Sequence, residues 1–573
     1  MLVLSLHLER YRLVLMLNFK YIYIMKRIKL IFISSFFTVF MFSSCEDAYN
    51  IVQDGELNES AITDVPKLQS YFNGIYADVS ISNQIGFTGI FTDECSVGRG
   101  NGGQNLNLHR FFLTTGEQFS TDIWYDTYAT ITRVNRLMRM VADPDGVGPL
   151  LGQVPLPSDP TELATYNSII AQARALRAFS YFQLLTYYST DLKDDNAPGV
   201  LFFTNVPGTG DLLPRVKNGI VFAQIEDDLD FAYNNVVASI VTPYKYVSKP
   251  MITALRARMY LYRGNYTLAK QYAQDAIATA GVSLTLANPV PTPAPTNPFY
   301  SAFSASIPAS AGAPTTAWNT GFYGAASTNP YRRMFADLAQ GEIIWSLDRP
   351  AAGTWENVAT QFTTNSSNLA GSPLYEVSRS LFNKLTSTAG DVRRYANVDP
   401  TSLLNQNYAT DPNYIATDVI VIDKYPGKPG FVTRNDIKVF RLSEMYFILA
   451  ECLANEGNIN GASNSVASVV KQIRTARNFL GAQPLPVYVD ATAAWAGILA
   501  ERRLELCFEG HRYIDMKRIG TKAGQTLDRD PTDDQITGSV LSIPNDDYRY
   551  TMPIPLGEIN ANPTIQQNPG YAQ

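Results

Sequence analysis

The sequence has little of the material from which most metal sites and acid–base catalytic sites are built. Its 573 residues include three histidines, His7, His109 and His511, so sites that depend on imidazole have few groups to draw on. The four cysteines, Cys45, Cys95, Cys452 and Cys507, show no CxxC spacing, which predicts neither a zinc site nor a disulfide scaffold. Neither sign of charge dominates, because 46 Lys and Arg stand against 52 Asp and Glu, and this excludes the basic surface of a nucleic-acid-binding protein.

The motifs of common reaction centres are also missing. GxSxG and HExxH do not occur, and the GRGNGG stretch at residues 98–103 is not followed by the GK[ST] that a phosphate-binding loop needs. What the chain does have is apolar material: 46% of the residues are hydrophobic and 17% are charged, which predicts a folded protein with a large core.

Three glutamates are the best catalytic candidates. Glu501, Glu505 and Glu509 recur every four residues and therefore share one helix face, and paired carboxylates are the groups that hydrolyse glycosidic bonds. A general acid, however, needs an apolar pocket that raises its pKa, whereas Arg502, Arg503, Arg512 and Arg518 are available nearby to keep these carboxylates charged. We therefore predict a salt-bridged structural helix, no catalysis and, for His511, a structural role.

One acidic stretch is a candidate for calcium. DRDPTDD at residues 528–534 offers oxygen ligands, but it lacks the glycine and the terminal glutamate of a helix–loop–helix calcium site. We predict no cofactor, with calcium at this stretch as the open alternative.

The N-terminal region reads as an export signal. From Met25 three basic residues precede an uncharged apolar run from Leu30 to Phe42, which is shorter than the roughly 20 residues that span a bilayer. Two serines then precede Cys45, a pattern that resembles the lipobox of bacterial lipoproteins and implies that Cys45 becomes the acylated first residue. We predict a misassigned upstream extension at 1–24, a signal peptide at 25–44 and one body from 45 to 573.

Helical periodicity with small residues marks the body. Alanines recur at helical spacing in 161–188, and the segments 253–280 and 441–478 each read as two helices joined by a Gly-containing turn. Such pairs resemble tetratricopeptide repeats, which stack because a single pair cannot bury its own apolar face. We predict an all-α array over about 62–282 and 434–520, followed by a C-terminal segment at 521–573.

The stretch from about 283 to 433 differs in composition from the helical segments, and its residue types suggest that it forms the binding surface. Five prolines between 289 and 298 block regular helix, so we predict long loops and short strands laid across the array. Aromatic rings stack on the C–H faces of sugars, and Asn, Gln, Asp and Arg bond their hydroxyls, although most rings will be ordinary core residues. A Gly-rich loop at 93–107 offers similar polar groups. The predicted ligand contacts on these segments are Arg99, Asn101, Asn105, Trp318, Tyr323 and Trp355.

These features together resemble one family. The matching segments, besides the lipobox, are WYDTYATITRVN from Trp124, ARALRAFSYFQLL from Ala173, ALRARMYLYRGNYTLA from Ala254, GEIIWS from Gly341, FRLSEMYFILAE from Phe440, ILAERRLELCFEGHRYIDMKR from Ile498 and MPIPLGEINANPTIQQNPGY from Met552. Over essentially the whole body the chain resembles the SusD/RagB family of surface nutrient-binding lipoproteins. The resemblance implies about four tetratricopeptide-like helix pairs with a looser region across one side.

The same resemblance implies a function. Members of this family bind oligosaccharides at the outer-membrane surface and deliver them to a SusC-like TonB-dependent transporter. We therefore expect a lipid-anchored, glycan-binding protein that is not an enzyme. The alternatives are a peptide-binding RagB-like member, a surface adaptor that binds no nutrient, and a glycosidase that uses Glu505 and Glu509.

Overall fold

The computed structural model describes residues 59–141, 154–208, 210–237, 242–296, 314–362, 373–536 and 538–572. The predicted upstream extension, the signal peptide and Cys45 lie outside the described residues. The chain divides into a unit that ends at Ala61, within which η2 (Glu59–Ala61) is described, and a unit from Ile62 to Gln573. The second unit contains the elements that position the candidate site.

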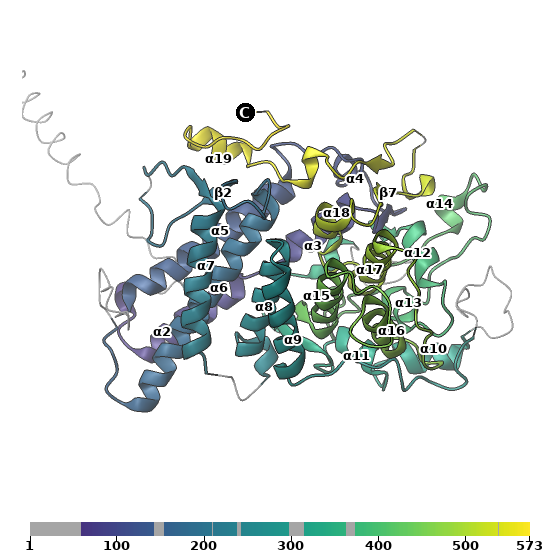
Figure 1. Ribbon diagram of the computed structural model, residues 1–573, viewed down its shortest axis with the longest axis horizontal. Coiled ribbons are helices and arrows are strands. Elements are labelled where there is room, and N and C mark those ends of the chain that lie inside the picture. Colours follow the sequence, from purple (N-terminus) through teal and green to yellow (C-terminus); the bar gives the residue numbers. More distant parts are fainter. Residues whose placement is uncertain are drawn as a thin grey trace, which may run out of the picture. The chain divides into compact units, whose positions relative to one another are not determined.

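Long helices build most of the second unit (Figure 1). They are α2 (Val65–Asp78), α3 (Ser82–Phe91), α5 (Gln118–Met140), α6 (Pro160–Tyr188), α7 (Asn218–Asn235), α8 (Lys249–Tyr262), α9 (Tyr266–Thr279), α15 (Leu442–Asn455), α16 (Val466–Ala476), α17 (Ala491–Leu506) and α18 (Arg512–Ile519). Successive helices pack as α5 on α6, α6 on α7, α8 on α9 and α15 on α16, and α9 packs on α15. The predicted stack of tetratricopeptide-like pairs is therefore confirmed.

Local signals in the sequence start and end these helices. Asp159 accepts hydrogen bonds from the backbone N–H groups of Thr161 and Glu162 at the start of α6, where Pro160 supplies the fixed φ of a first turn. Between α8 and α9 the turn needs a positive φ, and Gly264 adopts φ +73° there. The next residue, Asn265, caps α9 by accepting from the Leu268 N–H. The helix pair predicted for 253–280 thus forms as expected.

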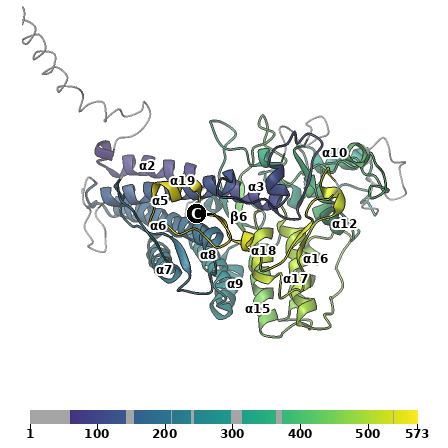
Figure 2. The ribbon, with the colours of Figure 1, turned by 90° about the horizontal axis from the view of Figure 1, so that it is seen from above.

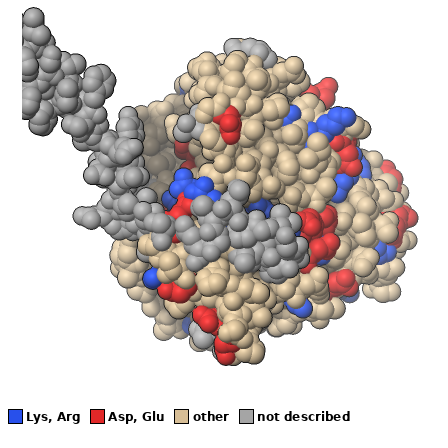
Figure 3. All heavy atoms as spheres, turned by 90° about the vertical axis from the view of Figure 1, so that its left-hand side faces the viewer, with Lys and Arg blue, Asp and Glu red and all other residues tan. Residues whose placement is uncertain are grey.

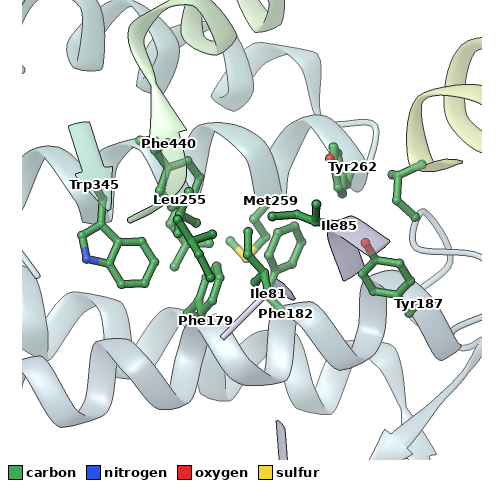
Figure 4. Packing of buried hydrophobic residues seen from close by; sticks show 14 of the residues in the cluster. Ile81, Ile85, Phe179, Phe182, Tyr187, Leu255, Met259, Tyr262, Trp345 and Phe440 are labelled. Carbon is green, nitrogen blue, oxygen red and sulfur yellow. The ribbon is translucent and has the colours of Figure 1, made fainter. Parts of the chain in front are cut away.

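Helix α6 is more deeply buried than its alanine stripe predicts. Ala171, Ala175 and Ala178 are buried as expected. From Ser168 to Tyr188, however, almost all of the remaining residues are buried too. Phe179 and Phe182 lie against Leu255 and Met259 of α8 in the core (Figure 4). A helix that is apolar on all sides lies in the interior, and α6 accordingly has α5 and α7 on its flanks.

The loop-rich region contains more helix than the prolines suggest. Short helices lie at α10 (Thr316–Tyr323), α11 (Pro330–Phe335), α12 (Arg379–Leu385), α13 (Val392–Asn397) and α14 (Tyr414–Thr417). The prediction of loops and strands alone was wrong here, because each helix begins after the proline-rich stretch and is short enough to leave a weak periodicity. The remaining short elements of the second unit are α4 (Leu106–His109), α19 (Leu556–Ala561), η3 (Pro243–Lys245), η4 (Val358–Gln361), η6 (Pro531–Asp533) and η7 (Tyr548–Tyr550).

Four small antiparallel sheets, each of two strands, tie distant segments together within the described residues. The strands are β1 (Cys95–Val97) with β5 (Tyr375–Val377), β2 (Pro198–Leu201) with β3 (Arg215–Lys217), β4 (Ile343–Leu347) with β6 (Ile437–Arg441), and β7 (Leu527–Asp528) with β8 (Ser542–Ile543). The pairing of Leu347 with Ile437 ties the middle of the loop-rich region to the strand that leads into α15.

The surface carries charge of both signs. On the face drawn in Figure 3, Lys and Arg atoms lie among Asp and Glu atoms and do not merge into a basic field. Within the part of the chain that the structure describes, no helix has both the length and the apolar character to cross a bilayer.

Candidate functional site

A cleft of about 130 Å³ brings aromatic and polar side chains together from three distant parts of the chain. Helix α2 supplies one wall, the end of η3 and the residue after it supply the second, and the end of β4 with the loop that follows supplies the third. Helix α2 lies along one side of the array in Figure 2, opposite the end where α9 and α15 lie. The residues that line the cleft are Asn73, Tyr76, Ala77, Lys245, Tyr246, Leu347, Asp348, Pro350 and Trp355. We call it the aromatic cleft.

Three rings form the walls of the aromatic cleft. Tyr76 and Tyr246 meet edge to face, with their ring centroids 5.6 Å apart. The Tyr76 hydroxyl donates to Gln172 Oε1 at 2.8 Å and accepts from the Val247 N–H at 2.6 Å, which fixes its ring. Tyr246 is 40% exposed and Trp355 is half-buried, so both present ring surface to solvent. This arrangement suits the apolar face of a flat ligand.

The polar groups of the aromatic cleft are held in place by ion pairs. Lys245 Nζ lies 2.7 Å from Asp348 Oδ1 and 3.0 Å from Asp436 Oδ2. Burial works against the charged ammonium, but the bond to Asp348 and the charge of Asp436 outweigh it and raise the pKa of Lys245. Asp348 is 42% exposed and keeps lone pairs free for a ligand hydroxyl.

One buried arginine fixes the loop that carries Trp355. Arg434, 5% exposed, donates to the carbonyl oxygens of four residues of this loop and to the Asn357 side chain. Its carbonyl partners, at 3.0–3.2 Å, are Pro350, Ala351, Gly353 and Trp355. The Trp355 indole N–H donates back to the Ala352 carbonyl at 2.9 Å. The loop is therefore ordered before any ligand arrives, which reduces the entropy that binding must lose.

The Gly-rich loop places its predicted contacts elsewhere. Arg99 is exposed, and its backbone N–H donates to Glu376 Oε1. Asn101 is 2% exposed and uses its amide to bond the carbonyls of Gln104 and Leu374, so it shapes the loop. Asn105 is exposed at φ +51°, just before α4. Arg99 and Asn105 can reach a ligand from this loop, whereas the side-chain amide of Asn101 is already occupied.

The predicted contacts on α10 differ from each other in burial. Trp318 is fully buried, and its ring stacks on Phe322 at 4.8 Å in a core cluster. A ligand would have to open that core to reach the indole, so the expectation that Trp318 contacts a ligand is corrected. Tyr323 is half-buried beside the Arg332 guanidinium, 5.1 Å from its ring centroid. Of the six predicted contacts, Trp355 lines the aromatic cleft.

Sequence reasoning missed most of the residues that surround Trp355. Tyr76 follows Phe72 at helical spacing and reads as core, and Tyr246 lies in a short stretch between two helices. The available signal was weak: Pro243 and Pro250 flank Tyr246 and indicate a turn that exposes an aromatic side chain.

The three glutamates are ion-paired, as predicted, but not with the predicted arginines. Arg393 Nη1 lies 2.7 Å from Glu501, Arg477 Nη2 lies 2.9 Å from Glu505, and Arg441 Nη2 lies 2.7 Å from Glu509. Arg441 Nη1 also lies 2.8 Å from Glu505. The arginines proposed from the sequence face other acids: Arg502 pairs with Asp515, Arg503 and Arg512 pair with Asp93, and Arg518 pairs with Glu451. Chain neighbours of a helical residue point in other directions, which explains the error.

This network holds Glu505 and Glu509 in the charged form. Burial alone would favour the neutral acid, but Arg477, Arg441 and Arg393 outweigh it and hold the pKa of Glu505 well below its ordinary value. The pKa of Glu509 is lowered in the same way, against burial, by Arg441 and Lys424. A glycosidase general acid needs the opposite shift, so the geometry favours a structural role.

The aspartates of the acidic stretch at 528–534 each contact a different partner. Asp534 pairs with Arg110 at 2.8 Å, Asp533 accepts from the backbone N–H of Arg379, and Asp530 caps η6. Among the described residues no group of three or more His, Cys, Asp or Glu side chains is placed to hold a metal ion.

Known proteins resemble the chain in sequence. Residues 400–571 match the family model described as the SusD family. SusD-like protein P2 of Formosa agariphila is 23% identical over 544 residues, which cover 90% of this chain and 94% of the relative.

Solved structures resemble it in fold. A SusD superfamily protein from Bacteroides thetaiotaomicron superposes with a TM-score of 0.64 at 22% identity, over 88% of this chain and 100% of the other. A laminarin-binding SusD-like protein gives a TM-score of 0.58 at 19% identity, over 88% of this chain and 99% of the other. At these identities the likeness establishes the fold.

Proposed function

Because this chain belongs to the SusD/RagB family, we propose that it captures oligosaccharides at the cell surface and delivers them to a SusC-like TonB-dependent transporter. The observation that carries the proposal is the aromatic cleft, where Tyr76, Tyr246 and Trp355 surround a small set of fixed polar groups. The SusD-like protein that binds laminarin shares the fold, which supports a carbohydrate as the ligand.

The chemistry of the aromatic cleft fits a sugar. A pyranose presents C–H groups on its face and hydroxyls around its edge, so it needs a ring to stack on and bonding groups beside that ring. Trp355 supplies the ring, and Asp348 and Asn73 supply the bonding groups at the rim. A volume of about 130 Å³ accepts one part of a longer chain, with the neighbouring units left in solvent.

Export and anchoring complete the proposal. We propose that Cys45 carries the lipid and that the body faces outward from the outer membrane. Stable anchoring takes two acyl signals or more, which a lipoprotein cysteine supplies. Purification from native membranes tests the partner: a TonB-dependent transporter is expected to co-purify with the full-length lipoprotein, and a preparation that lacks one would count against delivery.

In the proposed mechanism the protein binds the glycan without cleaving it. Glu501 and Glu505 are nearly inaccessible to solvent and are ion-paired with arginines, so a glycosidic oxygen does not reach them. Binding and release then depend on stacking and hydrogen bonds alone, and a site that makes few of them releases its cargo readily.

Replacement of the cleft tryptophan tests the function. Trp355→Ala removes the exposed ring, and we expect the affinity for the best ligand of a polysaccharide panel that includes laminarin to fall about tenfold, the equivalent of ~1.4 kcal/mol. Affinity electrophoresis identifies the ligand, and isothermal titration calorimetry measures the dissociation constant.

The matched control is Tyr233→Ala. Tyr233 is an exposed aromatic residue on α7, 39% accessible, and it lies outside the aromatic cleft. Its removal should leave the affinity unchanged. If Trp355→Ala binds the glycan as tightly as the unmodified protein does, or if no glycan of the panel binds, the assignment of the cleft is wrong.

A further inference from the structure

A second and larger cleft, of about 420 Å³, lies between α18, the segment after α6 and the C-terminal segment. Its lining residues come from 190–193, from α18 and from 545–551, and Pro569 closes one side. Tyr262 and Ile514 form an apolar floor, and both are almost fully buried. Figure 1 shows α18 next to the C-terminal segment. The volume falls within the range of pockets that hold small ligands. We call it the C-terminal cleft.

The C-terminal cleft contains an ammonium group that no described carboxylate pairs with. Lys517 is half-buried, and its Nζ donates to the Ser189 carbonyl at 3.0 Å and to Thr551 Oγ1 at 3.1 Å. An ammonium has three donors, and these two neutral acceptors leave one for a ligand. The next residue, Arg518, shows the contrast: it lies 2.8 Å from Glu451 and 3.0 Å from Asp515.

Among the charged groups of the C-terminal cleft, Lys517 is the one best placed to bind an anionic ligand. Burial lowers the pKa of Lys517 to about 8, and the charge of Asp191 offsets this only in part. Asp547 is neutralised by Arg549 at 2.6 Å. Lys193 and Asp546 stand exposed at the rim, the first as a second cation and the second as an acceptor for ligand hydroxyls.

A rigid aromatic ring stands at the mouth of the C-terminal cleft. Tyr548 is 45% exposed, and the edge of its ring contacts Tyr571 at a centroid distance of 4.9 Å. Gly570 packs close to the same ring at φ +88°, and a Cβ there would stand 2.4 Å from a ring carbon. The backbone of Gly570 therefore covers one part of the ring and holds it, and the exposed part remains available to a ligand.

We propose that the C-terminal cleft binds a carboxylate-bearing sugar unit, with its ring against Tyr548 and its carboxylate at Lys517 Nζ. A charge-assisted bond to the half-buried Lys517 ammonium is stronger than a neutral hydrogen bond, so the acid group dominates recognition. The site is separate from the aromatic cleft, whose Lys245 is already paired with Asp348 and Asp436.

Calorimetric titration of the full-length protein with D-glucuronate tests the proposal. We expect glucuronate to bind at least about tenfold more tightly than D-glucose, and Lys517→Met to weaken glucuronate binding at least about tenfold. The matched control is Lys471→Met, which removes an exposed lysine on α16 outside the cleft and should change the affinity less than about twofold. Tyr548→Ala should weaken glucuronate binding and leave the weak binding of acetate unchanged.

A direct readout guards against a folding defect in Lys517→Met. In protein labelled with ¹³C-lysine, the Lys517 side-chain Cε resonance should shift on addition of glucuronate and stay in place on addition of glucose. Equal affinities for the two sugars, an unmoved resonance, or acetate binding as tightly as glucuronate would each overturn the proposal. So would loss of glucuronate binding in Trp355→Ala, because the ligand would then occupy the aromatic cleft. This test does not depend on the aromatic cleft: glucuronate binding at the C-terminal cleft would stand even if no glycan of the panel bound at the aromatic cleft.

Discussion

Glu505 is the residue on which the buried charge network converges. Its carboxylate accepts from Arg441 and Arg477 and lies 3.4 Å from Arg393, and all four side chains are almost inaccessible to solvent. These arginines come from β6, from the residue after α16 and from α13, so one carboxylate ties three elements to α17. A carboxylate in this position stabilises the fold through its ion pairs and is not placed to donate a proton to a substrate.

The substitution Glu505→Gln should destabilise the protein without affecting any activity. It leaves three buried guanidinium groups without their shared anion, and loss of one partner from a buried ion pair costs about 3–5 kcal/mol of unfolding free energy. Urea unfolding followed by circular dichroism measures this. Neither form should release reducing ends from a glycan.

The control for that substitution is Glu456→Gln. Glu456 pairs with Lys270 at the surface, with 39% of its side chain exposed, and such a pair is worth less than about 1 kcal/mol. A loss of stability equal to that of Glu505→Gln would show that burial of the network is unimportant. Hydrolysis that disappears in Glu505→Gln would restore the glycosidase alternative.

Among the elements, the loop from Pro350 to Asn357 is the one whose conformation places Trp355 in the aromatic cleft. It contains little regular structure of its own, and its conformation depends on Arg434, which approaches from the segment before β6. Trp355 faces the cleft because this arginine and the Trp355 indole both bond backbone carbonyls of the same loop.

Arg434→Gln should therefore weaken glycan binding at the aromatic cleft about as much as Trp355→Ala does. The shorter amide cannot reach all the carbonyl partners, so the loop becomes mobile and must be ordered again when the ligand binds. Hydrogen–deuterium exchange should increase over residues 350–357.

Arg333→Gln is the matched control for the loop. Arg333 likewise donates to two backbone carbonyls, those of Ser327 and Leu338, but it belongs to α11 and does not line the aromatic cleft. It should leave both exchange over 350–357 and glycan affinity unchanged. Unaltered exchange in Arg434→Gln would mean that other contacts hold the loop.

At the scale of the whole molecule, buried acids of two kinds set the dependence of stability on pH. Burial favours the neutral form of Asp93 and Asp515, but the paired arginines outweigh it and lower the pKa of each to about 2. Burial raises the pKa of Glu94 to about 8, with a contribution from Asp93, and burial likewise raises the pKa of Glu376 to about 8.

The melting temperature should therefore be highest near pH 4, between the pKa values that these two kinds of acid have in the unfolded chain. Asp93 and Asp515 stabilise the fold above their unfolded pKa of about 4, and this stabilisation is lost as the pH falls through about 2. Glu94 and Glu376 stabilise it below an unfolded pKa of about 4.3, and theirs is lost as the pH rises through about 8. Differential scanning calorimetry between pH 2 and pH 8 measures both sides of the maximum.

Glu94→Gln separates the two effects. The neutral amide cannot ionise, so the fall in melting temperature between pH 5 and pH 8 should become shallower while the acidic side stays the same. A melting temperature that rises steadily from pH 5 to pH 8 in the unmodified protein would contradict the assignment of the raised pKa values.

The sequence by itself determined the helices and much of their order. The alanines of α6, the caps at Asp159 and Asn265 and the turn at Gly264 act between residues a few positions apart, so their effects can be read along the chain. The same local pattern predicted that Glu501 and Glu505 lie on one helix face and are ion-paired.

Only the tertiary structure decided which side chains meet across the chain. Trp318 and Trp355 stand in similar loop-rich sequence, yet the first is in the core and the second lines a cleft. That cleft needs Tyr76 from α2 and Tyr246 from before α8, and the C-terminal cleft needs Lys517 to face a segment that follows α6. Local periodicity carries no information about such contacts, because they depend on how whole helices pack against each other.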